Sequence, residues 1–201
     1  MKRGISITWA IMLMLTLACC KPQDVNKEIY KRYHDMKSYT AVVRVAVTGN
    51  KGVQEYAIRQ DYLAPDCYRT EVLEPENMKG TVTVFHGEKM SFQSAGADAA
   101  TLQRSISREK DYLFLPDFLA EYFAAEDTAD HTASADGNQT MLNAAVRGSR
   151  EERFTQNLWV DNKTLKPVRL STFDVDGSEI LRVEYESFEW NPQLEEQSFA
   201  L

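Results

Sequence analysis

The sequence predicts a mainly β domain of the α+β class, in which one long antiparallel sheet curls and helices cover its concave side. Most of the chain alternates apolar with polar residues in short runs joined by turn signals, which is the pattern of consecutive β-hairpins. Two segments, one before the strands and one between them, instead carry apolar residues at helical spacing. No repeat occurs at the period of a solenoid or a propeller. A sheet of about eight or nine strands tends to curl.

The first residues predict export through a lipoprotein signal. Two basic residues precede Ile5–Ala18, an uncharged and largely apolar run. This run is shorter than the ~20 residues that a membrane-spanning helix needs, so it fits a signal peptide better than a transmembrane span. We therefore divide the chain into a signal peptide over 1–18, a lipidated tether over 19–24 and a single domain over 25–201.

The signal ends in a sequence that is typical of a bacterial lipobox, Leu15-Thr16-Leu17-Ala18-Cys19-Cys20. In a lipobox a small residue precedes a cysteine that receives a diacylglycerol and acyl chains such as palmitate. Ala18 favours Cys19 as the lipidated residue, and Cys20 is the alternative. An ordinary secretory signal with incidental cysteines is the competing interpretation. Because a two- or three-chain anchor holds stably, we expect an extracytoplasmic protein attached to a bacterial membrane.

The charge of the chain disfavours some classes of partner. The chain carries 23 basic and 30 acidic residues, and removal of Lys2 and Arg3 with the signal changes the net charge from −7 to about −9. An acidic domain disfavours nucleic acid and electrostatic docking on anionic lipid. It leaves open the binding of lipid in an apolar cavity. The roughly 180 residues that remain suit one domain with a sizeable core.

Two helices are expected. Asp24 is placed to cap the first, whose apolar stripe consists of Val25, Ile29, Tyr33 and Met36. We expect this stripe to pack on the concave face of the sheet. Pro116 fits the first position of the second helix, and the apolar residues of Phe118–Phe123 lie on one side of it. We expect contact or gating at this second helix and its flanking polar loops, since loops on a rigid scaffold often carry recognition.

The strands are expected in two groups of hairpins. In the first group, runs of period 2 at 41–47 and 56–62 flank the turn signal Gly49–Gly52, and further strands follow at 67–73, 81–85 and 90–93. The small and polar residues of 94–108 and 126–140 predict loops. The second group consists of strands at 141–147, 154–160, 167–173 and 180–186, with Asp176-Gly177 as a hairpin signal.

The last strand carries a phase change. Phe188 and Trp190 follow out of phase with the apolar residues before them, which are Leu181, Val183 and Tyr185. A β-bulge inserts one extra residue and so shifts the alternation of faces by one. We therefore expect a bulge between Tyr185 and Phe188.

No catalytic or metal-binding pattern occurs in the sequence. The histidines His34, His86 and His131 have no second histidine or cysteine at ligand spacing. Asp174–Gly177 resembles the start of a calcium loop but lacks its later ligands, so a turn is expected there. There is no nucleophile elbow and no phosphate-binding glycine loop. We therefore expect no enzyme, no cofactor and no metal.

Two further features bear on binding. Cys67 is expected to be a buried free thiol, with a bond to the unlipidated cysteine at the end of the signal as the alternative. Aromatic residues on the strands are expected to line one concave surface: Tyr56, Tyr62, Tyr68, Phe85, Phe92, Trp159, Phe173 and Tyr185. They form either a packed core under the helices or a pocket for an acyl chain or an apolar partner segment.

Several short motifs resemble the LolA-like family of lipoprotein carriers and lipid-binding lipoproteins. They are Met36–Tyr39, Tyr68–Pro75, Lys79–Gly87, Leu158–Asp161, Pro167–Arg169, Asp176-Gly177 and Asn191-Pro192. Within this family the chain looks most like the clostridial germination lipoprotein (GerS) branch, along nearly all of the mature sequence. The resemblance implies a LolA-like domain over 25–201, a curved and half-open antiparallel barrel covered by helices.

The resemblance implies two functions of different classes. Likeness to the germination branch implies a lipid-anchored protein, at a cell or forespore membrane, that supports a cell-wall amidase in modifying spore cortex peptidoglycan. Likeness to the carriers, which are usually soluble, implies an apolar cavity for an acyl-chain ligand. A concave face filled by large side chains favours the first function, and an open one favours the second. The sequence leaves the oligomeric state open, with a homodimer as one option.

Overall fold

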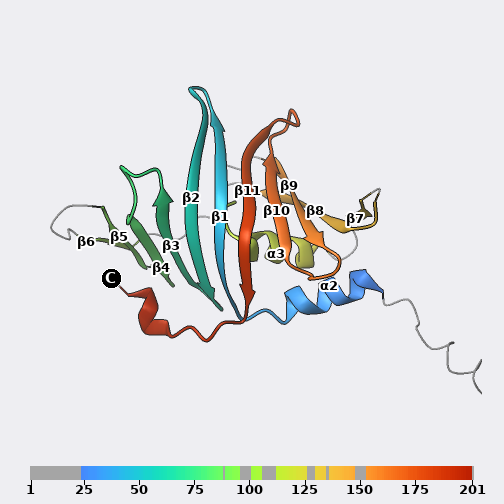
Figure 1. Cartoon of the computed structure of the whole chain (residues 1–201), viewed down its shortest axis with the longest axis horizontal. Helices are drawn as coiled ribbons and strands as arrows, with labels where there is room; N and C mark the ends of the chain where they lie inside the picture. The colour runs from blue at the N-terminus through green and yellow to red at the C-terminus, as the bar shows by residue number, and fades with distance from the viewer. Residues whose placement is uncertain are drawn as a thin grey trace, which may run out of the picture.

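The computed structural model describes residues 24–87, 89–95, 101–105, 112–125, 130–134, 136–147 and 153–200. The predicted signal peptide, the predicted lipobox and the proposed lipidation residue Cys19 therefore lie outside the described residues. The described residues form an 11-stranded antiparallel sheet with the order β6-β5-β4-β3-β2-β1-β11-β10-β9-β8-β7. The first half of the chain runs outward from β1, the second half runs outward from β11, and these two strands meet in the centre (Figure 1).

The helices of the described part are α2 (Val25–His34), α3 (Leu115–Ala124) and the short 3-10 helix η2 (Glu196–Phe199). The strands are β1 (Ser38–Gly49), β2 (Gly52–Leu63), β3 (Cys67–Glu74), β4 (Val82–His86), β5 (Lys89–Gln93), β6 (Thr101–Ser105), β7 (Asp130–Ala133), β8 (Gln139–Arg147), β9 (Arg153–Asp161), β10 (Pro167–Phe173) and β11 (Glu179–Trp190). Each strand from β1 to β5 and from β8 to β11 overlaps a run predicted from the period-2 pattern, because that period marks residues that alternate between two faces.

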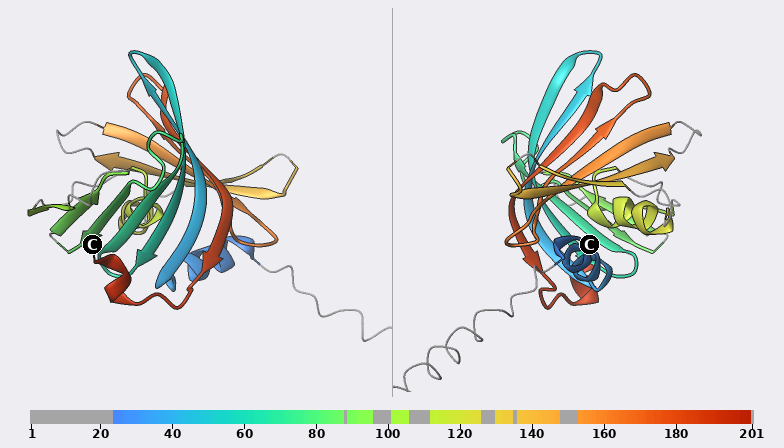
Figure 2. Two further views of the ribbon diagram at one scale, coloured as in Figure 1. Left: turned by 60° about the vertical axis from the view of Figure 1, so that its left-hand side comes forward. Right: turned by 90° about the vertical axis from the view of Figure 1, so that its right-hand side faces the viewer.

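The sheet is curved, and its edge strands β6 and β7 do not meet. Figure 2 shows α2 and α3 on the concave side, where the sheet wraps around them. The predicted fold class, a curved and half-open antiparallel sheet covered by helices, is confirmed. The physical reason is the right-handed twist of strands, which makes a long sheet coil and leaves one face to be covered.

Helix α2 packs on the sheet through the predicted stripe. Ile29, Tyr33 and Met36 retain 1%, 2% and 8% of their exposure and belong to the main core. Asp24 occupies the N-cap position, but its side chain makes no capping hydrogen bond. It instead forms an ion pair with Lys27 at 3.5 Å, so the capping role expected for the Asp24 side chain was wrong.

The predicted bulge is present on β11. Val42 lies opposite Ser187 and the next residue, Val43, lies opposite Tyr185, so Glu186 is the extra residue. After this insertion the alternation is reversed, and Phe188 returns to the core, where its ring stacks on Tyr39 at 5.2 Å between centroids.

Two predicted loops contain strands. Residues 94–108 include β6, and residues 126–140 include β7 and the start of β8. Both β6 and β7 are edge strands, so each pairs on one side only. Backbone hydrogen bonds to the neighbouring strand hold such an edge. Such a strand can form without alternating apolar residues, so the sequence carries no period-2 signal for β6 and β7.

The C-terminal segment builds a second, smaller core on the convex face. Phe199 of η2 packs with Cys67, Val82 and Val84, whose side chains lie on the opposite face from the main core. Cys67 is buried and free, as predicted, and burial raises the pKa of its thiol. This part of the convex face, over β3 and β4, is therefore covered, whereas none of the described helices lies on the part over β1, β11, β10 and β9 (Figure 1).

Candidate functional site

The concave face is filled by aromatic side chains. Ring contacts run from Phe188 on β11 through Tyr39, Tyr62 and Tyr68 to Phe114, which directly precedes α3; successive centroids lie 5.2, 5.6, 5.0 and 4.9 Å apart. Contacts of this kind stabilise a core beyond the area that they bury. Of the two readings of the aromatic residues, the packed core under the helices is therefore the one that the described residues form.

The space left between the two helices is small. The crevice that separates α2 from α3 has a volume of about 20 Å³ and is lined by Ile29, Tyr30, Tyr33, Tyr122, Phe123, Leu142 and Asn26. A volume of this size holds roughly one water molecule, whereas pockets for small ligands usually have about 300 Å³ or more. The crevice is therefore too small for an acyl chain.

Two buried glutamines attach the segment before α3 to the two halves of the sheet. The side-chain amide of Gln60 on β2 donates to the carbonyl of Leu113 at 3.2 Å, and that of Gln156 on β9 donates to the carbonyl of Tyr112 at 3.0 Å. Both glutamines are fully buried. Because a buried amide is costly to leave unpaired, these bonds favour the position of α3 against the sheet.

The buried phenols are not suited to acid–base chemistry. Burial raises the pKa of Tyr39 well above its ordinary value, and the neighbouring Tyr185 raises it further. Burial likewise raises the pKa of Tyr33 and of Tyr185. The hydroxyl of Tyr39 donates to the side-chain oxygen of Gln60 at 3.2 Å. These groups stay neutral and serve the packing of the core.

The three histidines, for which the sequence predicts no metal site, lie on separate elements of the fold. His34 stacks on Tyr30 and pairs with Asp35, and His86 lies 2.7 Å from Glu196 of η2. The side chain of His131 lies outside the described part of the chain. Among the residues that the structure describes, no three His, Cys, Asp or Glu side chains gather as a metal site would require. None of the described helices is long and apolar enough to cross a membrane.

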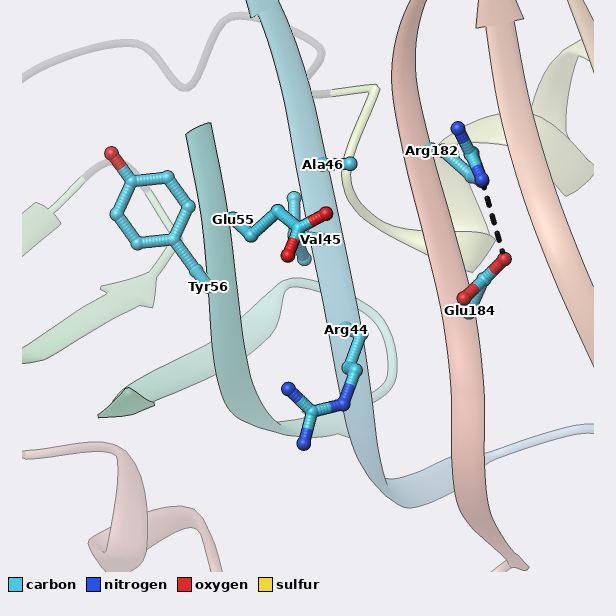
Figure 3. A pocket seen from close by; sticks show the side chains of 7 residues that line it. All are labelled: Arg44, Val45, Ala46, Glu55, Tyr56, Arg182 and Glu184. Carbon is cyan, nitrogen blue, oxygen red and sulfur yellow. Dashed lines mark ion pairs between the residues drawn. The ribbon is translucent and has the colours of Figure 1, made fainter. Parts of the chain in front are cut away.

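The uncovered convex face carries a network of ion pairs. On β1, Arg44 lies between Glu186 and Glu74, the latter at 3.1 Å, and these carboxylates raise the pKa of Arg44. On β11, Arg182 lies 2.9 Å from Glu179 and 3.6 Å from Glu184. Figure 3 shows the ion pair between Arg182 and Glu184 along β11, beside Arg44 and Glu55. The small side chain of Ala46 leaves a hollow of about 70 Å³ among them.

A larger groove continues from this hollow across β10 and β9. It has a volume of about 470 Å³, and Arg44 and Glu184 line both spaces. Two neighbouring bulges shape it, one at Glu186 on β11 and one at Val168 on β10, which has no partner between the pairs Pro167–Val160 and Arg169–Trp159. Bulges bend a strand and re-aim its side chains, and they are frequent beside functional sites.

Trp159 lines this convex groove, so its predicted place on the concave face was wrong. Its neighbours Leu158 and Val160 are fully buried in the main core, and alternation directs Trp159 to the other face. There the guanidinium of Arg169 lies over the indole, 3.8 Å from its centroid. The predicted concave position of Phe173 was wrong as well. Thr172 points inward, where its hydroxyl accepts a hydrogen bond from the buried Gln156, so the next residue, Phe173, faces outward like Trp159.

Sequence reasoning missed the convex groove. The available signal was the set of charged residues that alternate with apolar ones on β1 and β11, such as Arg44, Arg182 and Glu184. Charged residues at such positions read as ordinary solvated surface. Their grouping depends on the pairing of β1 with β11, two strands that are far apart in the sequence.

The family model for sporulation protein YdcC-like proteins matches residues 1–199. The chain belongs to this sporulation protein family. A curated relative in this comparison is the sporulation protein YdcC of Bacillus subtilis, which is 19% identical over 208 residues. That alignment covers 98% of this chain and 60% of the relative, so the chain spans less than two thirds of the relative's length.

Several solved structures are similar to this YdcC-like chain. A chain in the structure of the CwlD amidase from Clostridioides difficile in complex with the GerS lipoprotein is 24% identical, with 85% of this chain and 96% of that chain covered and a TM-score of 0.52. An uncharacterised protein from Thermus thermophilus is 14% identical, with 87% and 91% covered and a TM-score of 0.50. The LolA superfamily protein NE2245 from Nitrosomonas europaea is 11% identical, with 88% and 97% covered and a TM-score of 0.46. The resemblance to the germination lipoprotein branch is confirmed at the level of the fold.

Proposed function

We propose that this protein is a membrane-anchored extracytoplasmic lipoprotein that acts by non-covalent binding, supporting a peptidoglycan amidase during modification of the spore cortex. The observation that carries the proposal is the filled concave face. The family to which the chain belongs is one of sporulation proteins. A protein of the same fold, GerS, is a lipoprotein that forms a complex with the CwlD amidase.

The filled interior supports the binding role over the carrier role, the two functions that the resemblance implies. A carrier needs an apolar space of several hundred Å³. Between α2 and α3 the described side chains leave about 20 Å³. The side chains that fill this side include Phe114, Leu115 and Phe118, each at most 1% exposed. The alternative, a lipid or lipoprotein carrier, would therefore require α3 to leave the sheet.

Deletion of the gene from its spore-forming host tests the proposed role. Spores of the deletion strain are expected to contain cortex peptidoglycan with fewer amidase products and to germinate poorly, and the wild-type gene restored at another locus is expected to correct both. Muropeptide analysis and germination assays provide the measurements. Normal cortex and normal germination in the deletion strain would contradict the proposal.

A second measurement separates the binding role from the carrier role. A full-length variant with Cys19→Ala and Cys20→Ala, exported without an anchor, is purified and extracted with organic solvent. We expect less than one acyl lipid per protein molecule, because the concave side is filled. Stoichiometric acyl lipid, together with a deletion strain that germinates normally, would support the carrier instead.

We propose that Cys19 bears the lipid anchor, with the signal peptide over 1–18 removed. Ala18 before Cys19 and the short apolar run support this assignment. The intact mass of the membrane-extracted protein is expected to equal that of residues 19–201 plus a diacylglycerol and any N-acyl chain. Cys19→Ala is expected to prevent the modification, and Cys20→Ala is the matched control that leaves it in place. An unacylated mature N-terminus would refute the anchor, and acylation at Cys20 would move it by one residue.

A further inference from the structure

We propose that the convex groove around Trp159 and Arg169 is a docking site for a partner protein that presents a carboxylate side chain to Arg169. This inference rests on the proposed function, and the occupant is the proposed amidase partner. The groove lies on the part of the convex face that the C-terminal segment leaves uncovered, and its volume is about 470 Å³.

Arg169 differs from the other arginines of the groove in its partners. Arg44 and Arg182 each contact two carboxylates of this chain. In the described part of the chain, no carboxylate forms an ion pair with Arg169. Glu184 lies directly opposite Arg169 across β10 and β11, but its carboxylate pairs with Arg182. The guanidinium of Arg169 therefore keeps its donors available for a carboxylate from another molecule.

The stacking of Arg169 makes it a preorganised group. Its guanidinium lies 3.8 Å from the centroid of the Trp159 ring, and both side chains are only half-buried. A planar guanidinium held on an aromatic face loses less freedom when it binds, and its fork matches a carboxylate with two parallel hydrogen bonds. Tryptophan and arginine are also the residue types that most often dominate the binding energy of protein interfaces.

The shape and charge of the groove favour a protein as its occupant. The groove is lined by carboxylates and guanidiniums, and each of them except Arg169 forms an ion pair within this chain. An anionic membrane would meet Glu184 and Glu186, which repel it. A protein loop with one well-placed aspartate or glutamate can satisfy Arg169 while its other residues fill the hollow made by the two bulges.

The test measures binding of the CwlD-like amidase of the same organism to the full-length lipoprotein held in detergent. Arg169→Gln is expected to raise the dissociation constant roughly 30-fold or more, the usual range for a dominant interface residue. Arg169→Lys, which keeps the charge but loses the planar fork, is expected to weaken binding by a smaller factor. The matched control is Arg59→Gln, which removes the same charge from an exposed convex position on β2 outside the groove, and it is expected to bind as wild type.

Each outcome of this test supports or overturns the inference. Equal binding by wild type and Arg169→Gln would show that the amidase docks elsewhere, so the inference fails while the proposed function stands. No binding by wild type would overturn the proposed function, and the inference with it. A dimer of this chain that Arg169→Gln disrupts, with amidase binding unchanged, would assign the groove to a second copy and overturn the inference. Circular dichroism of each variant verifies that it is folded before binding is measured.

Discussion

Phe118→Ala is expected to lower the free energy of unfolding by about 3–5 kcal/mol, the range for deletion of a fully buried phenylalanine. Phe118 of α3 is completely buried in the main core, and its ring stacks on Tyr122 at 5.8 Å between centroids. Alanine would leave a cavity on the concave side of the sheet, where a carrier would hold its ligand. Urea unfolding, with the slope m compared between variants, measures the change.

The control for Phe118 is an exposed position on the same helix. Ala120 is exposed, so Ala120→Ser is expected to change the free energy of unfolding by about 0.5 kcal/mol or less. A loss below about 1 kcal/mol for Phe118→Ala would be too small for a buried phenylalanine. It would mean that α3 does not fill the concave side in solution, and the carrier function would regain its main structural argument.

The second large effect concerns the first helix. Ile29→Ala is expected to cost about 2–5 kcal/mol, because Ile29 is 1% exposed and packs with Tyr33 in the main core. The same urea experiment measures it. Tyr30→Ala provides the comparison on the same helix, since Tyr30 is 53% exposed and its loss is expected to be smaller. A change below about 0.5 kcal/mol for Ile29→Ala would indicate an exposed stripe and a different position for α2.

These two substitutions also link stability to function. Because α2 and α3 cover the concave side together, a variant that loosens either helix opens the space that an acyl chain would need. Lipid that binds to Phe118→Ala and not to wild type would indicate that the fold of a carrier is present with its cavity closed by side chains.

Much of the local structure could be predicted from the sequence. The stripe of α2, the hairpin around Gly49–Gly52 and the bulge before Phe188 were all confirmed, because each depends on the spacing of apolar residues within a few turns of chain. The edge strands β6 and β7 were missed because one-sided backbone pairing leaves little trace in side-chain pattern. Arg169, the candidate docking residue, belongs to the Pro167–Arg169 motif, but the sequence alone predicts no role for it.

The sequence by itself determined which residues alternate, where helices and hairpins begin, and that no nucleophile or metal-ligand pattern is present at recognisable spacing. The tertiary structure decided which strands are neighbours, and thereby which face each alternating set occupies. Period 2 assigns residues to two faces but does not say which face is covered. That is why Trp159 was expected inside and lies outside on Arg169, and why only the pairing of β1 with β11 brought Arg44 and Glu184 to one groove.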